Sequence, residues 1–437
     1  MKDPLEHVDL KIRQLLIGGV VFVVAAIALA IANPTLAGTI GVVLFFFVVM
    51  IGLHELGHFV MAKRAGMKVT EFFIGFGPRL WSVTRGETEY GLKALPLGGY
   101  CKIVGMTNLE DVDPVDEARA FRAKGWWAKV STVVAGPVTH FALAIMFVYA
   151  ILVGGGDRHA AATTLTVGEV TTELAQLDAD GNQVGTVPSA ADEAGIEPGD
   201  TIVSLDGEEP PSWDALTTEF RSRPGETMTL TVDRDGELLD LTVTITEVWR
   251  DDATDRLAVD EFDGGERGGF VGLSPVIDIP EVGWFEAMHL APTRSVQGAV
   301  ETVGALGHMF SPAGVGEYLD NFSASEEEQS DTRFISPVGF SRVASDAVRA
   351  GWISVFGLLA SINLFVGLLN LLPLLPFDGG HIAVASYEAI ASKVRRRPVR
   401  VDFARLIPVM VATLSVLAFI FASSLFLDIA RPPDVGF

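Results

Sequence analysis

Two histidines and a glutamate, His54, Glu55 and His58, are spaced as a metal site on a helix requires. Residues i and i+4 of a helix share a face, so both imidazoles can converge on one Zn²⁺ ion, with Glu55 beside it as a general base. The three residues end an uncharged apolar segment, where ionisable groups are costly and usually serve a function. They predict metal-assisted peptide hydrolysis. The alternative is a pair of histidines that caps a membrane span at the interface.

Asp378 is the candidate for a third metal ligand, because catalytic zinc normally takes three protein ligands. It is the only carboxylate between Ala350 and Glu388 and lies in the segment NLLPLLPFDGG, residues 370–380. Prolines and glycines interrupt an apolar helix there, and non-helical backbone at membrane depth is tolerated only where it lines a cavity. Such backbone can also pair with a substrate strand. A simple turn at a helix end is the alternative.

Five apolar segments are candidate membrane spans that position these residues. They cover residues 15–31, 39–53, 130–153, 351–375 and 407–427. We interpret the first as a span and not as a cleaved signal peptide, because it leads directly into more apolar sequence. With 49% hydrophobic and 20% charged residues and a mean hydropathy of +0.38, the protein is unlike an ordinary soluble enzyme.

Charge predicts how the spans are oriented. The sequence has 32 Lys+Arg and 55 Asp+Glu, a net charge of −23, which excludes nucleic acid as a partner. Basic residues gather in loops 61–129 and 392–405, so the positive-inside rule makes both loops cytoplasmic. The acidic block 155–350 is then extracytoplasmic and the active site lies toward the cytoplasmic side. A salt-rich habitat is a second explanation of the acidity. The single cysteine, Cys101, excludes an intrachain disulfide.

The predicted domain order follows from these assignments. Residues 1–60 form two membrane helices, 61–129 a cytoplasmic loop, 130–154 a third helix and 155–165 a linker. Residues 166–250 form a domain, and 251–350 connect it to the membrane. Residues 351–391 form a span with the active-site turn, 392–405 a basic loop, and 406–437 the last span with a tail.

Two of these regions have patterns of their own. Alternating, glycine-punctuated residues at 70–102 predict short strands at the membrane surface or a small packed satellite. Apolar residues spaced along 284–310 predict an amphipathic helix. Its apolar face is expected to pack on its own domain, with contact to membrane lipid as the alternative.

The extracytoplasmic segments 188–220 and 228–245 resemble a bacterial PDZ domain. The matching features are the small residues before Ile196, the Pro198-Gly199-Asp200 segment, a turn at Asp206-Gly207, a helix near 213–220 and a hairpin at Asp235-Gly236. PDZ domains add a peptide strand at a sheet edge and hold a terminal carboxylate in backbone amides. The resemblance implies either binding of a peptide or a carboxyl terminus, or steric gating of an entrance, and the sequence leaves both open.

Taken together, the motifs resemble the site-2 protease family of intramembrane zinc metalloproteases, in its bacterial PDZ-containing branch. They are HELGH, the glycine-rich segments at 74–78 and 96–100, AGPVTH at 135–140, SPVGF at 336–340 and NLLPLLPFDGG. The resemblance implies that His54, His58 and Asp378 bind Zn²⁺ and that Glu55 is the catalytic base. It also implies that further residues hold the substrate backbone, and these are Asn370, Pro373, Gly98 and Gly99. His140 stands where many members have Asn, and we interpret it as a core or packing residue, with an accessory polar group as the alternative.

The implied fold is a polytopic α-helical protein of the cell membrane with a membrane-associated β region and an extracytoplasmic PDZ (α+β) domain. The implied function is a zinc metalloendopeptidase for regulated intramembrane proteolysis. Its substrates would be single-span membrane proteins, for example anti-sigma factors after a first cut, or remnant signal peptides. Substrate helices with helix-weakening residues should be preferred. The alternatives are a PDZ receptor or chaperone with a structural metal, a zinc transporter and an anchored ectopeptidase.

Overall fold

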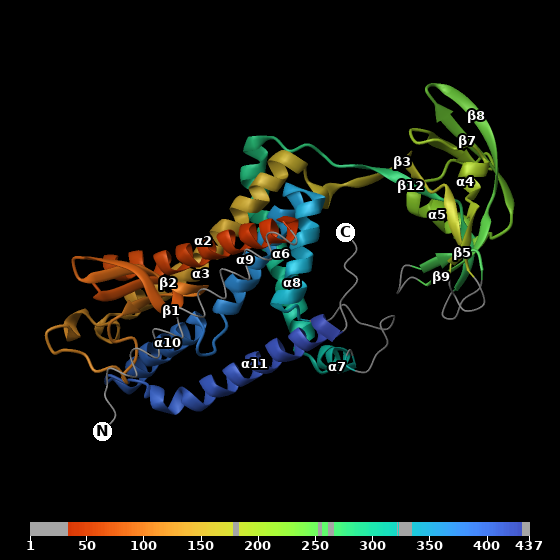
Figure 1. Cartoon of the computed structure of the whole chain (residues 1–437). Coiled ribbons are helices and arrows are strands. Elements are labelled where there is room, and N and C mark those ends of the chain that lie inside the picture. Colours follow the sequence, from red (N-terminus) through yellow and green to blue (C-terminus); the bar gives the residue numbers. More distant parts are fainter. Residues whose placement is uncertain are drawn as a thin grey trace. The chain divides into compact units, whose positions relative to one another are not determined.

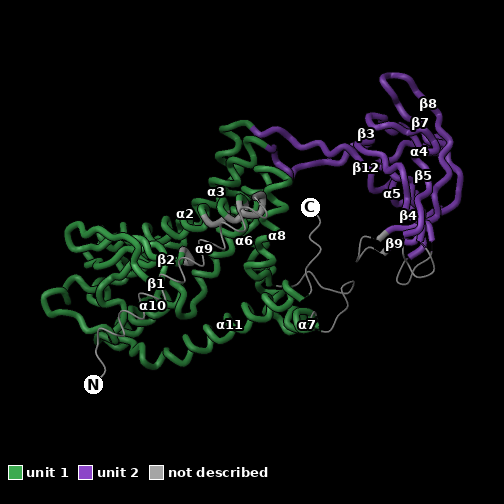
Figure 2. Tube along the Cα trace, in the orientation of Figure 1, with its two compact units in different colours: residues 1–154, 283–322, 330–437 green, residues 155–282, 323–329 purple. Residues whose placement is uncertain are grey.

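The computed structural model describes residues 34–177, 183–251, 256–260, 266–320, 322 and 334–430. The protein divides into two compact units, coloured separately in Figure 2. Unit 1 comprises residues 1–154, 283–322 and 330–437, and unit 2 comprises residues 155–282 and 323–329. The span predicted at 15–31 lies outside the described residues.

Unit 1 is built on apolar helices, labelled in Figure 1. Among the described residues, four helical segments are long and apolar enough to cross a membrane, and they are Phe45–Arg64, Trp126–Gly155, Trp352–Asn370 and Phe403–Ala430. They belong to α2 (Pro34–Arg64), α3 (Trp126–Gly155), α9 (Trp352–Asn370) and α11 (Ile407–Ala430) with the 3₁₀ turn η5 (Phe403–Leu406) before it. The predicted helices at 39–53, 130–153 and 407–427 are therefore confirmed as parts of helices of suitable length and composition. The helix predicted at 351–375 is confirmed only as far as Asn370, because the proline-containing segment that follows forms the turn before α10.

A glycine brings α2 and α3 into close contact. A Cβ atom on Gly57 would overlap the carbonyl of Ala135 and lie 3.1 Å from the Thr139 side chain. Small residues allow backbones to approach closely in membranes, where no hydrophobic force drives helices together. The helix that carries both histidines is thus fixed directly against the AGPVTH segment.

Strands β1 (Val69–Arg85) and β2 (Thr88–Ile103) form an antiparallel pair with several register shifts. Both strands are long and bent, so residues 71–74 of β1 pair with two segments of β2. These segments are 99–102 on one side and 89–92 on the other. Among the described residues, no further strand pairs with 99–103, which leaves this segment at an edge of the sheet. The strands predicted within 70–102 are confirmed. A small core packs the sheet on α2 and α3, and it contains Ala62, Met67, Val69, Ile103, Phe121 and Val133.

The other helices of unit 1 are shorter or more polar. They are η1 (Glu117–Arg119), η2 (Phe121–Ala123), α6 (Trp284–Met309), α7 (Pro312–Asp320), α8 (Pro337–Ala350) and α10 (Asp378–Arg395). The SPVGF segment begins α8, where Ser336 caps the helix by accepting a hydrogen bond from the amide of Val338. Asp428 of α11 accepts hydrogen bonds from the amides of Ser336 (2.7 Å) and Gly339 (3.2 Å). A buried carboxylate therefore joins the last span to the start of α8.

The predicted amphipathic helix at 284–310 exists as α6, but most of its large apolar side chains are exposed; Phe310 at its C-cap is the one that lies beside another ring, that of Phe334, among the described residues (centroids 6.0 Å apart). The buried residues of α6 are the small ones, Ala287, Ala291 and Ser295. Trp284 and Phe285, which we expected in the packed face, are 73% and 84% exposed. The expectation that the apolar face covers its own domain is therefore wrong. Periodicity shows which residues share a face, not what that face contacts.

Unit 2 contains a five-stranded sheet in the order β12-β3-β6-β7-β8, a β4-β5 hairpin and a three-stranded sheet in the order β10-β9-β11. The strands are β3 (Ala162–Val170), β4 (Glu173–Leu177), β5 (Gln183–Pro188), β6 (Thr201–Leu205), β7 (Thr227–Arg234), β8 (Glu237–Thr244), β9 (Thr246–Asp251), β10 (Arg256–Ala258), β11 (Glu266–Phe270) and β12 (Leu273–Asp278). Its helices are η3 (Arg158–Ala160), α4 (Ala190–Glu193) and α5 (Trp213–Ser222). Because β12 pairs with β3, this unit extends beyond the predicted 166–250 segment.

The turns of unit 2 follow from its sequence. Asp206-Gly207 and Asp235-Gly236 both have positive φ at two successive residues, as tight hairpin turns require. The core is formed by Trp213, Leu216 and Phe220 of α5 against Leu230 and Val232 of β7 and further apolar residues of the sheet. The predicted helix near 213–220 is confirmed as α5.

Candidate metal centre

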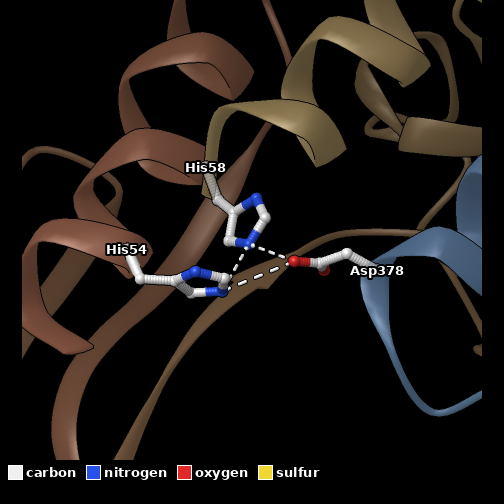
Figure 3. A group of neighbouring side chains, drawn as sticks. All are labelled: His54, His58 and Asp378. Atoms are coloured by element: carbon white, nitrogen blue, oxygen red, sulfur yellow. Dashed lines mark hydrogen bonds and ion pairs between the residues drawn. The ribbon is translucent and has the colours of Figure 1, made fainter. Parts of the chain in front are cut away.

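Figure 3 shows that His54 and His58 of α2 and Asp378 of α10 point toward one another. The Nε2 atoms of the two histidines are 3.1 Å apart. The Oδ2 atom of Asp378 lies 3.4 Å from His54 Nε2 and 3.3 Å from His58 Nε2. One turn of α2 separates the two histidines, and Asp378 reaches them as the first residue of α10.

These separations fit a tetrahedral zinc ion. Zinc bonds of about 2.0–2.2 Å in a tetrahedron place neighbouring ligand atoms about 3.3–3.6 Å apart. Among the described residues, the buried Oδ2 atom of Asp378 has no partner besides the two imidazoles, although a buried carboxylate oxygen normally requires one. The donor set of two imidazoles and one carboxylate also suits zinc. The residues therefore fit the metal.

A backbone carbonyl sets the orientation of His58. Its Nδ1 atom lies 2.9 Å from the carbonyl oxygen of Thr132 on α3. A carbonyl only accepts, so Nδ1 carries the proton and Nε2 presents its lone pair to the metal position. The Nδ1 atom of His54 is buried without a hydrogen-bond partner among the described residues, and Gly136 of α3 lies directly beside the ring. Helix α3 therefore contacts both imidazoles, through Thr132 and Gly136.

Gly136 has a role that the sequence analysis missed. A Cβ atom at this position would lie 2.7 Å from His54 Cε1 and 2.6 Å from His58 Cε1, and closer still to His58 Nε2. Only glycine leaves room for both rings. Gly136 is part of the AGPVTH motif. The need for glycine at this position is visible only once α3 is in contact with α2.

Two further glycines fix Asp378. A Cβ atom on Gly379 would overlap the carbonyls of Leu371 and Leu372, and one on Gly380 would lie 2.7 Å from the amide of Leu375. The turn between α9 and α10 thus folds directly over the first residues of α10. This explains why two glycines follow Asp378 in the sequence.

Glu55 of α2 lies next to the edge of the sheet formed by β1 and β2. A Cβ atom on Gly99 would lie 3.0 Å from Glu55 Cγ, and the Cys101 amide interacts with the Glu55 carboxylate. Burial raises the pKa of the Cys101 thiol to about 12, so this thiol is unreactive at neutral pH. The segment 99–101 therefore lies beside the candidate base.

The remaining predicted substrate-binding residues differ in their surroundings. Asn370 is the last residue of α9, and Pro373 is exposed in the turn that follows. Gly98 has a φ of 156° and lies against the ring of Phe76. Of the four residues, Gly99 is the one that the structure brings next to Glu55.

His140 is 1% exposed and lies beside the site. Its Nδ1 atom donates to Asn363 Oδ1 of α9 (3.0 Å), and Asn363 Nδ2 donates to the carbonyl of Leu359 (2.8 Å). The ring centroids of His140 and His54 are 5.0 Å apart. His140 is thus buried between α9 and a candidate metal ligand and also makes a polar contact, so it has features of both a packing residue and an accessory polar group.

Helices fit for a membrane and a His-His-carboxylate centre with an adjacent glutamate together define a membrane-embedded metallohydrolase. The model of peptidase family M50 matches residues 42–417. The zinc metalloprotease Rip1 of Mycolicibacterium smegmatis is 34% identical over 411 residues, which cover 91% of this sequence and 98% of that protein. Rip1 of Mycobacterium tuberculosis is 37% identical over 366 residues, 81% of this sequence and 87% of that protein.

The protein belongs to peptidase family M50, the site-2 protease family. It is a zinc metalloprotease of a family that performs intramembrane proteolysis, and its apolar helices agree with a multi-pass membrane protein. The family resemblance seen in the sequence is confirmed.

Proposed function

We propose that this protein cleaves membrane-spanning segments of single-span proteins, with His54, His58 and Asp378 as the zinc ligands. The convergence of their three ligand atoms within 3.1–3.4 Å carries the proposal. Bound zinc supplies Lewis-acid chemistry, which acidifies water and polarises a peptide carbonyl.

Glu55 performs the proton transfers. Its carboxylate accepts a proton from the attacking water and returns that proton to the amine that leaves. The Cys101 amide holds the carboxylate in place during both transfers. The carbonyl of Thr132 keeps His58 in the tautomer that binds metal.

The edge segment 99–103 is proposed to bind the substrate backbone. A helical substrate hides its peptide bonds in its own hydrogen bonds, so it must unwind before it is cut. No further described strand pairs with this edge, so its backbone groups other than the Cys101 amide can pair with an extended peptide, and Gly99 places the edge beside Glu55. Asn370 and Pro373 are proposed to hold the substrate from the side of the α9-α10 turn, and Gly98 to shape the strand end.

Unit 2 is proposed to be an extracytoplasmic PDZ domain that controls access to the site, which opens toward the cytoplasmic side. A cavity of about 200 Å³ lies between α5 and the β11-β12 connection, with Trp213, Phe220, Arg221, Phe270 and Gly272 in its wall. Its place beside a helix and a strand edge supports binding of a peptide or a carboxyl terminus. Regulated cleavage of anti-sigma factors or remnant signal peptides is the activity that such control would serve.

The test uses the full-length protein in reconstituted vesicles with a tagged single-span substrate. Glu55→Gln is expected to keep zinc and to lose at least about 10²-fold in cleavage rate. Asp378→Ala is expected to lose both zinc and cleavage. Asp113→Ala, an exposed loop carboxylate, is the matched control and should keep both. Full cleavage by Glu55→Gln would contradict the proposed base. Zinc binding without cleavage of any substrate by the wild type would favour a PDZ receptor.

A further inference from the structure

Helix α6 has three distinct faces. Ala287, Ala291 and Ser295 are buried. A Cβ atom placed on Gly298 would lie 3.2 Å from the Leu364 side chain of α9. These four small residues recur every three or four positions and so form one stripe of the helix. Packing of α6 on α9, a candidate span, uses this stripe. Small-residue stripes are the usual contacts between helices in membranes.

Next to this stripe, α6 presents a flank of large apolar side chains, which we call the apolar flank. Exposure along it ranges from 54% for Val303 to 84% for Phe285. The apolar flank consists of Trp284, Phe285, Met288, Val296, Val300 and Val303.

The charged side chains of α6 lie on a different flank. The helix contains three charged residues, Glu286, Arg294 and Glu301. At 100° per residue they fall within one sector on the other side of the small-residue stripe, together with Gln297. One flank of α6 is therefore apolar, and the opposite flank is charged and suited to water.

A comparison within the protein indicates what covers the apolar flank. Large apolar residues of the span α11 are exposed to a similar degree, for example Phe419 at 59% and Val411 at 52%. In α5, a helix of unit 2, the large apolar residues Trp213, Leu216 and Phe220 are 5% exposed or less. The apolar flank thus resembles a lipid-facing span and not the face of a soluble helix.

We infer that the apolar flank of α6 is embedded in the hydrocarbon region of the bilayer, while the flank that carries Glu286, Arg294 and Glu301 faces water. Three observations carry this inference. They are the small-residue packing on a span, the exposed large apolar side chains and the separation of charge to the other side. The segment after unit 2 is then part of the membrane domain, which goes beyond the proteolytic function.

The inference is tested by site-directed spin labelling of the full-length protein in phosphatidylethanolamine and phosphatidylglycerol vesicles. Labels are placed at Val296→Cys and Val300→Cys on the apolar flank, and at Gln297→Cys and Glu301→Cys as neighbours on the charged flank. Phe419→Cys of α11 and Glu219→Cys of α5 are the references for lipid and water. Wild type, with its unreactive Cys101, is the labelling control, and unchanged zinc content shows that each variant is folded.

Collision with oxygen, which concentrates in lipid, is compared with collision with a water-soluble nickel chelate. The ratio of oxygen to nickel collisions is expected to be several-fold higher at positions 296 and 300 than at 297 and 301, and similar to that at 419. A ratio at 296 and 300 like that at 219 would show water on the apolar flank and overturn the inference. Low collision rates with both reagents at positions 296 and 300 would show that protein covers the apolar flank. This result would also overturn the inference.

Discussion

Gly136 of α3 lies against the His58 imidazole at the point where any side chain would overlap the metal-facing nitrogen. Two helices from separate spans meet here, and the missing Cβ atom is what permits both histidines to face Asp378. The geometry of the site therefore depends on a residue that is neither a candidate metal ligand nor the candidate base.

Substitution of Gly136 by alanine is expected to displace the imidazoles and to reduce bound zinc strongly. The physical reason is the 2.7 Å approach of the added methyl group to His54 Cε1 and its closer overlap with His58. Zinc is measured by mass spectrometry on purified protein, and cleavage is measured in parallel. Gly357→Ala is the matched control, because Gly357 is a helical glycine of α9 with open space around it. Equal zinc in both variants would contradict this account.

Asp428 is expected to stabilise unit 1 through the start of α8. Asp428→Ala leaves the Ser336 amide without this acceptor, while the Gly339 amide keeps its longer hydrogen bond to Ser336 Oγ (3.5 Å), and a buried unpaired group costs about 1–3 kcal/mol. A lower thermal unfolding temperature in detergent is therefore expected. Asp428→Asn keeps an acceptor oxygen and should recover part of the loss. Asp346→Ala, whose ion pair with Arg349 lies within α8, should change the temperature little. Equal effects of Asp428→Ala and Asp346→Ala would rule out the capping role.

The pair His140 and Asn363 should join α3 to α9. His140→Leu removes the donor to Asn363 Oδ1 and leaves this oxygen unpaired in the interior, at a cost of about 1–3 kcal/mol. His140→Asn places an amide donor at the same position and is expected to be less destabilised. The measurement is thermal unfolding of the zinc-loaded protein. If leucine is tolerated as well as asparagine, the hydrogen bond contributes nothing to stability.

Unit 2 is expected to lose stability in acid through Asp200. The Arg234 guanidinium donates to both oxygens of this buried carboxylate at 2.7 Å and lowers its pKa below the ordinary value of 3.8. A lowered pKa stabilises the fold above pH 3.8, and this stabilisation is lost as the pH falls through the folded-state pKa. Calorimetry of the full-length protein between about pH 6 and pH 3 should show the loss below about pH 4.

Arg234→Met tests whether the ion pair with Asp200 causes the loss of stability in acid. Without the guanidinium, burial favours the neutral acid, so the pKa of Asp200 should rise toward or above its ordinary value of 3.8. The loss of stability in acid that comes from Asp200 should then become smaller, and a folded-state pKa above 3.8 would reverse its sign. An unchanged pH profile in this variant would show that Asp200 does not control the acid stability of unit 2.

The parts of the fold and site that the sequence predicted depend on local geometry. The approach of His54 and His58 follows from helix periodicity, and Asp378 follows from its isolation among apolar residues. Gly136, the His140–Asn363 hydrogen bond and the Asp428 cap depend on which helices meet, and the pattern of one segment contains no such information. The apolar face of α6 was predicted, but its environment was not, because apolar spacing is the same against protein and lipid.

The order of the ligands in the sequence has a consequence for biosynthesis. His54 and His58 emerge from the ribosome early, whereas Asp378 follows only after unit 2 and the α9 span have been made. A nascent polypeptide therefore carries two of its three candidate ligands for most of its synthesis, and zinc affinity should rise sharply when α10 arrives. The candidate site is then completed late in synthesis, when α10 has been made and only the α11 span and the residues around it remain. A protein truncated before residue 378 should be inserted but unable to cut.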